Sequence, residues 1–187
     1  MIHATSACGK ALSFLLLNSI AYLWTPPLCR SQLGENDIIP YQARYRQDVI
    51  DLWTIDGDFS PTYKLFLAFL GRKFCFLLVD RNNRLLGFIC FYYRFRDLGK
   101  RHIHAAFKII APEERGKGYA SLLHRTAFAT FRRSRWIHGV SATYAVNNEV
   151  SRKSMQNYGY RVVRRYFEHG SGTEKEDAVY DFTYNLQ

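Results

Sequence analysis

The sequence of 187 residues has few cysteines, and they lack the spacing of a metal site. Its four cysteines include no C-x-x-C pair, and no Cys/His cluster has the spacing typical of zinc. Cys75 and Cys90 lie inside apolar runs, where a thiol behaves as a small hydrophobic side chain. We therefore predict no metal, no disulfide framework and a reducing intracellular compartment. That compartment is the cytoplasm, or the mitochondrion if the N-terminus is a targeting segment.

The sequence also lacks an apolar run that would span a bilayer comfortably. The run ALSFLLLNSIAYLW covers only residues 11–24, whereas a spanning helix needs about 20 apolar residues. No acidic residue precedes Glu35, and the stretch TPPLCRSQLG after the apolar run resembles a linker. We interpret residues 1–36 as an extension: a targeting segment, a membrane contact through residues 11–24, or an element that packs on the domain. Residues 37–187 then form one domain.

Acidic residues are almost absent between residues 115 and 167. This stretch contains one acid, Glu149, and eleven basic residues: Arg115, Lys117, Arg125, Arg132, Arg133, Arg135, Arg152, Lys153, Arg161, Arg164 and Arg165. The excess of ten equals the net charge of the chain, so the remainder is neutral. Such a concentrated positive field favours a polyanionic ligand or partner. A basic surface that only keeps the protein soluble is the alternative.

The apolar patterns alternate between strand and helix periodicity. Strands are expected at residues 37–43, 73–80, 85–96, 102–112 and 136–146, with two more after residue 160, and helices at 45–55, 60–71, 118–131 and 147–160. Ser60 is the expected cap of the second helix and Gly71 its expected end. This order predicts an α/β fold, with a mixed, mostly antiparallel central sheet and helices on both faces.

The sequence RGKGYA at residues 115–120 follows a predicted strand and opens a predicted helix. A helix N-terminus offers unpaired backbone N–H groups and a positive dipole end. Two glycines permit positive φ and a close approach of the backbone to a ligand. The turn therefore suits a phosphate or pyrophosphate. It is not a P-loop, because Gly118 stands where Ser or Thr would follow the lysine.

Two motifs together resemble the GCN5-related N-acetyltransferases, the GNAT family. The turn matches the pattern Q/R-x-x-G-x-G/A of that family. The segment NEVSRKSMQNYGY at residues 148–160 is similar to the last helix of the family, with Asn148, Ser151, Gly159 and Tyr160 matching. The resemblance extends over residues 37–184 in the order of elements. It implies the acyl-CoA N-acyltransferase fold and direct attack of an amine on acetyl-CoA in a ternary complex.

The resemblance also implies a binding site for acetyl-CoA as co-substrate. Backbone N–H groups near Ile109 and Ile110 would stabilise the thioester oxygen. The residues expected to contact the cofactor are Ile109, Ile110, Arg115, Gly116, Lys117, Gly118, Tyr119, Ala120, Asn148 and Ser151. No metal is implied.

The proton carriers are less defined. Many family members place a tyrosine four residues before the last glycine, but this position is Met155. Ser151, Ser154, Tyr144, Tyr158 or bulk water would then act instead. In the histone-acetylating branch a glutamate eleven residues before the turn is the base, and here that position is His104. Strand alternation places His104 on one face with Lys108, opposite Phe107. We predict His104, Tyr144 and Ser151 as catalytic residues, although His104 without any task is an equal alternative.

The acceptor stays open among a peptide N-terminus, a lysine, a polyamine, an amino sugar and other small amines. A second hypothesis is an inactive regulatory domain that binds acetyl-CoA, because the usual tyrosine is missing. A third is a module that binds nucleic acid or an anionic surface through Arg132, Arg133 and Arg135 with Trp136 beside them. No nucleic-acid motif is present, which argues against the third hypothesis. The sequence does not indicate an oligomeric state.

Overall fold

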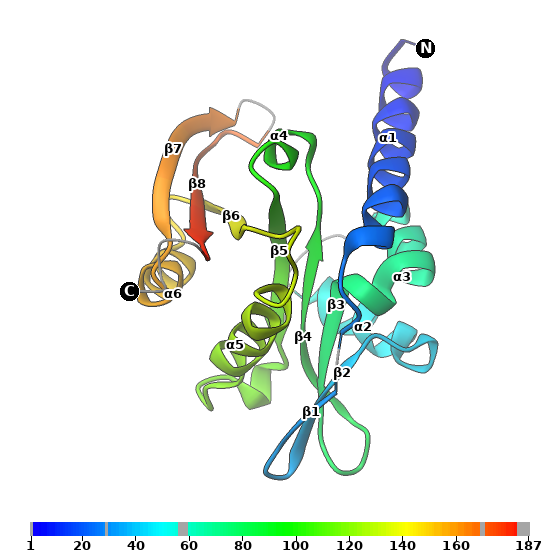
Figure 1. Ribbon diagram of the computed structural model, residues 1–187, viewed down its shortest axis with the longest axis vertical. Coiled ribbons are helices and arrows are strands. Elements are labelled where there is room, and N and C mark those ends of the chain that lie inside the picture. The colour runs from blue at the N-terminus through cyan, green and yellow to red at the C-terminus, as the bar shows by residue number, and fades with distance from the viewer. Residues whose placement is uncertain (1, 29, 56–59, 169–170, 183–187) are drawn as a thin grey trace.

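The computed structural model describes residues 2–28, 30–55, 60–168 and 171–182, and its fold is built on one mixed sheet (Figure 1). Eight strands lie in the order β1-β2-β3-β4-β5-β6-β8-β7, and β5 and β6 are the parallel pair. The strands are β1 (Ser31–Leu33), β2 (Asn36–Pro40), β3 (Cys75–Val79), β4 (Leu85–Tyr92), β5 (His102–Ile110), β6 (Gly139–Ala145), β7 (Arg161–Glu168) and β8 (Thr173–Asp181). The predicted mixed, mostly antiparallel sheet is confirmed.

Helices cover both faces of this sheet, as predicted. They are α1 (Ile2–Trp24), α2 (Arg46–Thr54), α3 (Pro61–Phe74), the short α4 (Phe95–Leu98), α5 (Tyr119–Phe131) and α6 (Glu149–Asn157), with 3₁₀ turns at Ala43–Tyr45 and Pro112–Glu114. On one face Trp53 of α2 contacts Phe88 of β4. On the other face Phe131 of α5 contacts Phe91 of the same strand. Aromatic side chains therefore join both helical layers to the sheet.

Helix α3 runs further than the sequence pattern indicated. Gly71 was the expected end, but the helix continues to Phe74. A Cβ atom at position 71 would lie 2.8 Å from Cδ1 of the buried Tyr41. The expectation was wrong because this glycine serves close packing between α3 and the chain after β2, and not the end of a helix.

The C-terminal half of helix α1 packs on the domain beside α3, and its N-terminal end projects away from it (Figure 1). The buried side chain of Asn18 exchanges two hydrogen bonds with the backbone of Tyr93, accepting from its N–H at 2.7 Å and donating to its carbonyl oxygen at 3.2 Å. Phe14 contacts Phe66 of α3 at a ring distance of 5.5 Å. No helix in the described ranges is long and apolar enough to cross a membrane. A targeting or membrane role for residues 1–36 stays a prediction.

Candidate functional site

A cleft opens where the two parallel strands separate. The ladder between β5 and β6 joins His102–Ala105 to Gly139–Ala142 and goes no further. Because β5 continues to Ile110, the backbone groups on its β6 side beyond Ala105 have no partner in this ladder. A cavity of about 780 Å³ occupies the gap.

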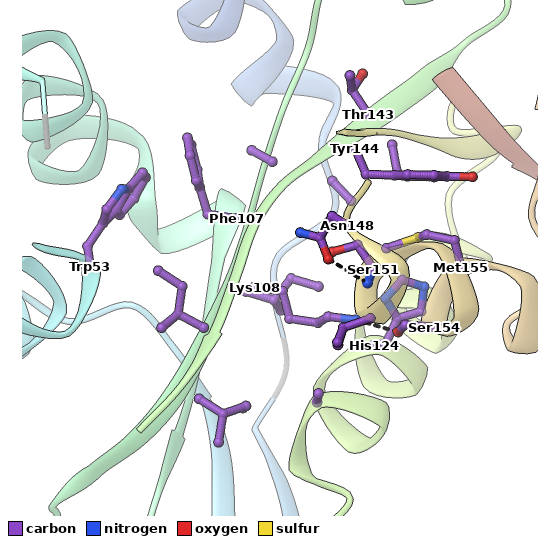
Figure 2. A pocket seen from close by; sticks show the side chains of 18 of the residues that line it. Trp53, Phe107, Lys108, His124, Thr143, Tyr144, Asn148, Ser151, Ser154 and Met155 are labelled. Carbon is purple, nitrogen blue, oxygen red and sulfur yellow. Dashed lines mark hydrogen bonds between the residues drawn. The ribbon is translucent and has the colours of Figure 1, made fainter. Parts of the chain in front are cut away.

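Side chains from both faces of the sheet line this cleft (Figure 2). Trp53 and Phe107 lie on one side of β5, while α5 and α6 contribute side chains on the other side. The lining residues are Trp53, Ile89, Ala105, Ala106, Phe107, Lys108, Ile109, Ile110, Arg115, Ala120, His124, Ala142, Thr143, Tyr144, Asn148, Val150, Ser151, Ser154 and Met155. Two molecules can therefore approach the same gap from opposite faces.

The glycine turn lies at one end of the cleft. Gly116 and Gly118 have φ values of 82° and 80°, which glycine adopts far more readily than other residues. A Cβ atom at either position would meet nothing within 4 Å, so the backbone faces open space here. Helix α5 begins at Tyr119, and Gly118 as its N-cap supplies no side-chain bond to the first turn. The first N–H groups of α5 are thus available to an anion.

The charges around this turn form a local network. Arg115 donates from Nε to the carbonyl oxygen of Ile110 at 3.1 Å, which ties the turn to the end of β5. Lys117 and Arg84 both contact the carboxylate of Glu114, at 2.8 and 2.7 Å. Hydrogen bonds from Lys117 and then Arg84 lower the pKa of Glu114. Arg84 also contacts Asp80 and Glu113, each at 3.4 Å, so the carboxylates balance these two cations and the network leaves no positive excess.

Helix α6 forms another part of the cleft wall. Asn148 is its N-cap, and Oδ1 accepts a hydrogen bond from the N–H of Ser151 at 3.0 Å. Gly159 ends the helical segment with φ of 83°, and the N–H of Tyr160 donates to the carbonyl oxygen of Met155 at 3.0 Å. The second sequence motif therefore sets the two ends of α6, and Asn148 and Ser151 lie in the cleft wall.

A lysine and a histidine that the sequence analysis did not select lie in the same cleft. Lys108 donates from Nζ to Oγ of Ser154 at 3.2 Å and lies 4.8 Å from the ring centre of Tyr158. Burial lowers the pKa of Lys108 to about 8. His124 stacks on Tyr158 at 4.0 Å. Burial, followed by the charge of Lys108, lowers the pKa of His124 to about 3, so its ring is neutral at pH 7.

Comparison with known proteins gives a family match for this chain. A sequence model described as the "Acetyltransferase (GNAT) family" matches residues 42–160, more than half of the chain. This chain belongs to the GNAT family. A search of curated protein sequences found no match.

Several solved structures share this GNAT fold. NAA60 of Arabidopsis thaliana, in complex with acetyl-CoA, is 13% identical over 79% of this chain and 99% of its own, with a TM-score of 0.70. Naa50 of the same plant, bound to the bisubstrate analogue CoA-Ac-MVNAL, is 13% identical over 79% and 99%, with a TM-score of 0.66. A spermidine N-acetyltransferase from Vibrio cholerae is 15% identical over 83% and 98%, with a TM-score of 0.61. At these identities the likeness shows the fold alone.

In this GNAT chain His104 does not lie where alternation placed it. Cys90 pairs with Phe107 and Phe91 pairs with Ala105, so Ala106 is an extra residue that forms a bulge. The bulge turns His104 to the face of Phe107 and away from that of Lys108. The placement of His104 and Lys108 on one face was therefore wrong.

His104 is also buried among polar groups outside the cleft lining. Its Nδ1 lies 3.1 Å from Oγ of Ser141, which donates to Asp97 at 2.9 Å. Burial, and then the charges of Arg94 and Arg96, lower the pKa of His104 well below its usual value. The ring is neutral at pH 7, and its role as a base stays a prediction.

Tyr144 lines the cleft beside Met155 (Figure 2). Burial, followed by hydrogen bonding and repulsion from Glu176, raises the pKa of Tyr144 to about 12. Tyr144 is therefore protonated at neutral pH and is a hydrogen-bond donor and not a base. Met155 has no proton to give.

The cleft brings together seven of the predicted site residues: Ile109, Ile110, Arg115, Ala120, Tyr144, Asn148 and Ser151. Gly116, Lys117, Gly118 and Tyr119 form the adjoining turn. Lys108 was named in the sequence only for the face of its strand and not as a site residue, and a single lysine between apolar neighbours was the available signal. His124 carried no signal, since a histidine within a helix has no characteristic pattern.

Proposed function

We propose that this protein transfers the acetyl group of acetyl-CoA to a primary amine, by direct attack within a ternary complex. The observation that carries this proposal is a cleft between two separating parallel strands that is lined from both faces of the sheet. On one face of the sheet, the N-terminus of α5 has N–H groups that can bind an anion beside the gap. On the other face, Trp53 and Phe107 form aromatic walls. An anionic thioester and an amine can then meet in the gap without passing each other.

The residues of the turn fit the pyrophosphate of acetyl-CoA. Gly116 and Gly118 leave the backbone open to close approach, and the first turn of α5 has N–H groups to donate. Arg115 adds a guanidinium at the cleft wall. The unpaired edge of β5 beyond Ala105 supplies backbone N–H groups that can stabilise the thioester oxygen as negative charge develops.

The acceptor side favours an amine that carries an apolar group. Trp53 and Phe107 lie with ring centres 3.9 Å apart, and Tyr63 lies 5.1 Å from Phe107. Aromatic walls suit an apolar side chain next to the reacting nitrogen. The similar Naa50 structure holds the bisubstrate analogue CoA-Ac-MVNAL. We therefore rank a peptide N-terminus with a large apolar residue above a polyamine for this chain.

The amine must also lose a proton. His104 is neutral, which a base requires, but it is hydrogen-bonded to Ser141 and lies outside the cleft lining. A water at the cleft wall would have to connect it to the substrate. We propose transfer to bulk water as the main route, with His104 as the second candidate.

The cofactor assignment is tested by placing a carboxylate in the turn. Gly118→Glu should reduce acetyl-CoA affinity at least about 100-fold in calorimetry, because a negative side chain would enter the pyrophosphate site. Gly172→Glu is the matched control, since Gly172 also has positive φ, at 64°, and open space around it. Unchanged affinity in a folded Gly118→Glu variant would refute the assignment.

A second function is favoured by Met155, which stands where many GNAT members have a tyrosine. A regulatory domain would bind acetyl-CoA without transferring its acetyl group. A thiol-release screen with N-terminal peptides, lysine peptides, polyamines and amino sugars separates the two. Binding without thiol release across the panel would select the regulatory function.

A further inference from the structure

We propose that Lys108 replaces the missing tyrosine as the proton donor to the departing thiolate. This inference rests on the proposed acetyl transfer. Lys108 is a cation in the cleft that belongs to neither sequence motif, residues 115–120 or residues 148–160.

The position of Lys108 in the cleft is the first support. It belongs to the part of β5 beyond Ala105, where β5 has separated from β6. Its ammonium group lies against α6, held by Oγ of Ser154 at 3.2 Å, one residue before Met155 (Figure 2). The proton-bearing end of Lys108 therefore reaches the wall that Met155 leaves without a donor.

The charge of Lys108 is not neutralised by a neighbouring acid. No carboxylate among the described residues forms an ion pair with it, and Lys108 lies partly buried in the cleft wall. From α5 it faces His124, which is neutral, and from the end of α6 it faces the ring of Tyr158 at 4.8 Å. From β6 the other titratable group in the lining is Tyr144, and from the turn it is Arg115. An anion formed in this gap would find Lys108 as an uncompensated positive group.

Acetyl transfer forms one bond and breaks one bond, and two protons move. The lone pair of the amine nitrogen attacks the acyl carbon, a C–N bond forms, and the C–S bond breaks with its electron pair going to sulfur. The Lys108 ammonium gives one proton to that sulfur and becomes neutral. The nitrogen releases one proton to water, and Lys108 later takes one from water. The products are the N-acetylated amine and the free thiol.

Other groups in the cleft are weaker donors. Tyr144 holds its proton tightly, with a pKa of about 12. The hydroxyls of Ser151 and Ser154 are less acidic still. Lys108 has a pKa of about 8, so it is protonated at pH 7 and yet releases its proton readily.

The test compares Lys108→Met with Lys108→Arg and with Lys153→Met. Lys153 is exposed on α6 and contacts Glu149 at 3.7 Å, so it is a control for the loss of one positive charge. Methionine keeps the length of the side chain but has no proton. Arginine keeps the charge but releases no proton in the working range.

With the best acceptor from the thiol-release screen, Lys108→Met should lower kcat about 10²-fold or more. Its acetyl-CoA affinity should stay within about threefold of wild type by calorimetry. Wild-type kcat should fall above about pH 8, as Lys108 loses its proton, and both Lys108 variants should lack this limb. Lys108→Arg should also turn over slowly, because charge alone does not supply the proton, and Lys153→Met should match wild type.

Three results would overturn the proposal. If Lys108→Met turns over within about twofold of wild type, the donor lies elsewhere while the proposed acetyl transfer stands. If Lys108→Arg restores wild-type kcat, Lys108 acts through its charge and not through its proton. If the wild type binds acetyl-CoA and releases no thiol with any amine, both the proposed function and this role are refuted.

Discussion

Replacing Lys108 by methionine should stabilise the folded protein at neutral pH. Burial lowers its pKa from 10.5 to about 8. Each pKa unit corresponds to about 1.4 kcal/mol, so the charged side chain costs the folded state about 3 kcal/mol relative to the unfolded chain. Lys108→Met also removes the hydrogen bond to Ser154 and the contact with the Tyr158 ring, each worth about 1 kcal/mol. The expected gain in the free energy of unfolding is therefore about 1 kcal/mol at pH 7.

The pH dependence makes this prediction specific. Between about pH 8 and 10.5 the unfolded chain keeps the proton of Lys108 while the folded protein loses it, so wild-type stability should gain a positive contribution as pH rises. Below about pH 8 the buried charge of Lys108 costs the folded state its full free energy, and above about pH 10.5 this cost is zero. Urea unfolding, followed by tryptophan fluorescence at pH 7 and pH 9.5, measures the free energy of unfolding of wild type and Lys108→Met. Lys153→Met is the control. A stability difference between wild type and Lys108→Met that is the same at both pH values would refute the reasoning.

Two further predictions concern stability. Wild-type unfolding free energy should fall as pH drops below about 6.5, because His104 and His124 have lowered pKa values and the unfolded chain takes up protons first. His124→Phe, which keeps a ring against Tyr158, should make this fall shallower by about 1.4 kcal/mol per pH unit, and an unchanged slope in urea titrations would contradict it. Asn18→Ala should destabilise the protein by about 1–3 kcal/mol, because the backbone groups of Tyr93 lose buried partners. Faster amide exchange in α1 than in α5 would accompany that loss, and identical exchange in both helices would contradict it.

The parts of the site that depend on neighbours along the chain were predictable. The positive φ of Gly116 and Gly118 and the cap formed by Asn148 follow rules that act within about one turn of helix. For that reason the motifs located the turn and both ends of α6. The element order and the mixed sheet followed from periodicity in the same way.

The orientation of side chains within the cleft was not predictable by the same rules. Counting alternate residues along β5 placed His104 beside Lys108, but the bulge at Ala106 separated them. A bulge belongs to the pairing of two strands, so it depends on the register between β4 and β5 and not on the sequence of β5 alone.

The amino-acid sequence by itself determined the family, the glycine turn before α5, the ends of α6 and the absence of the usual tyrosine at Met155. Those features depend on residue type and short spacing. Only the tertiary structure decided that β5 and β6 separate after Ala105, that Lys108 reaches Ser154 in the resulting cleft, and that His104 is buried with a hydrogen bond to Ser141. These arrangements depend on which strands pair and where pairing stops, and such long-range contacts leave no local pattern in a single sequence.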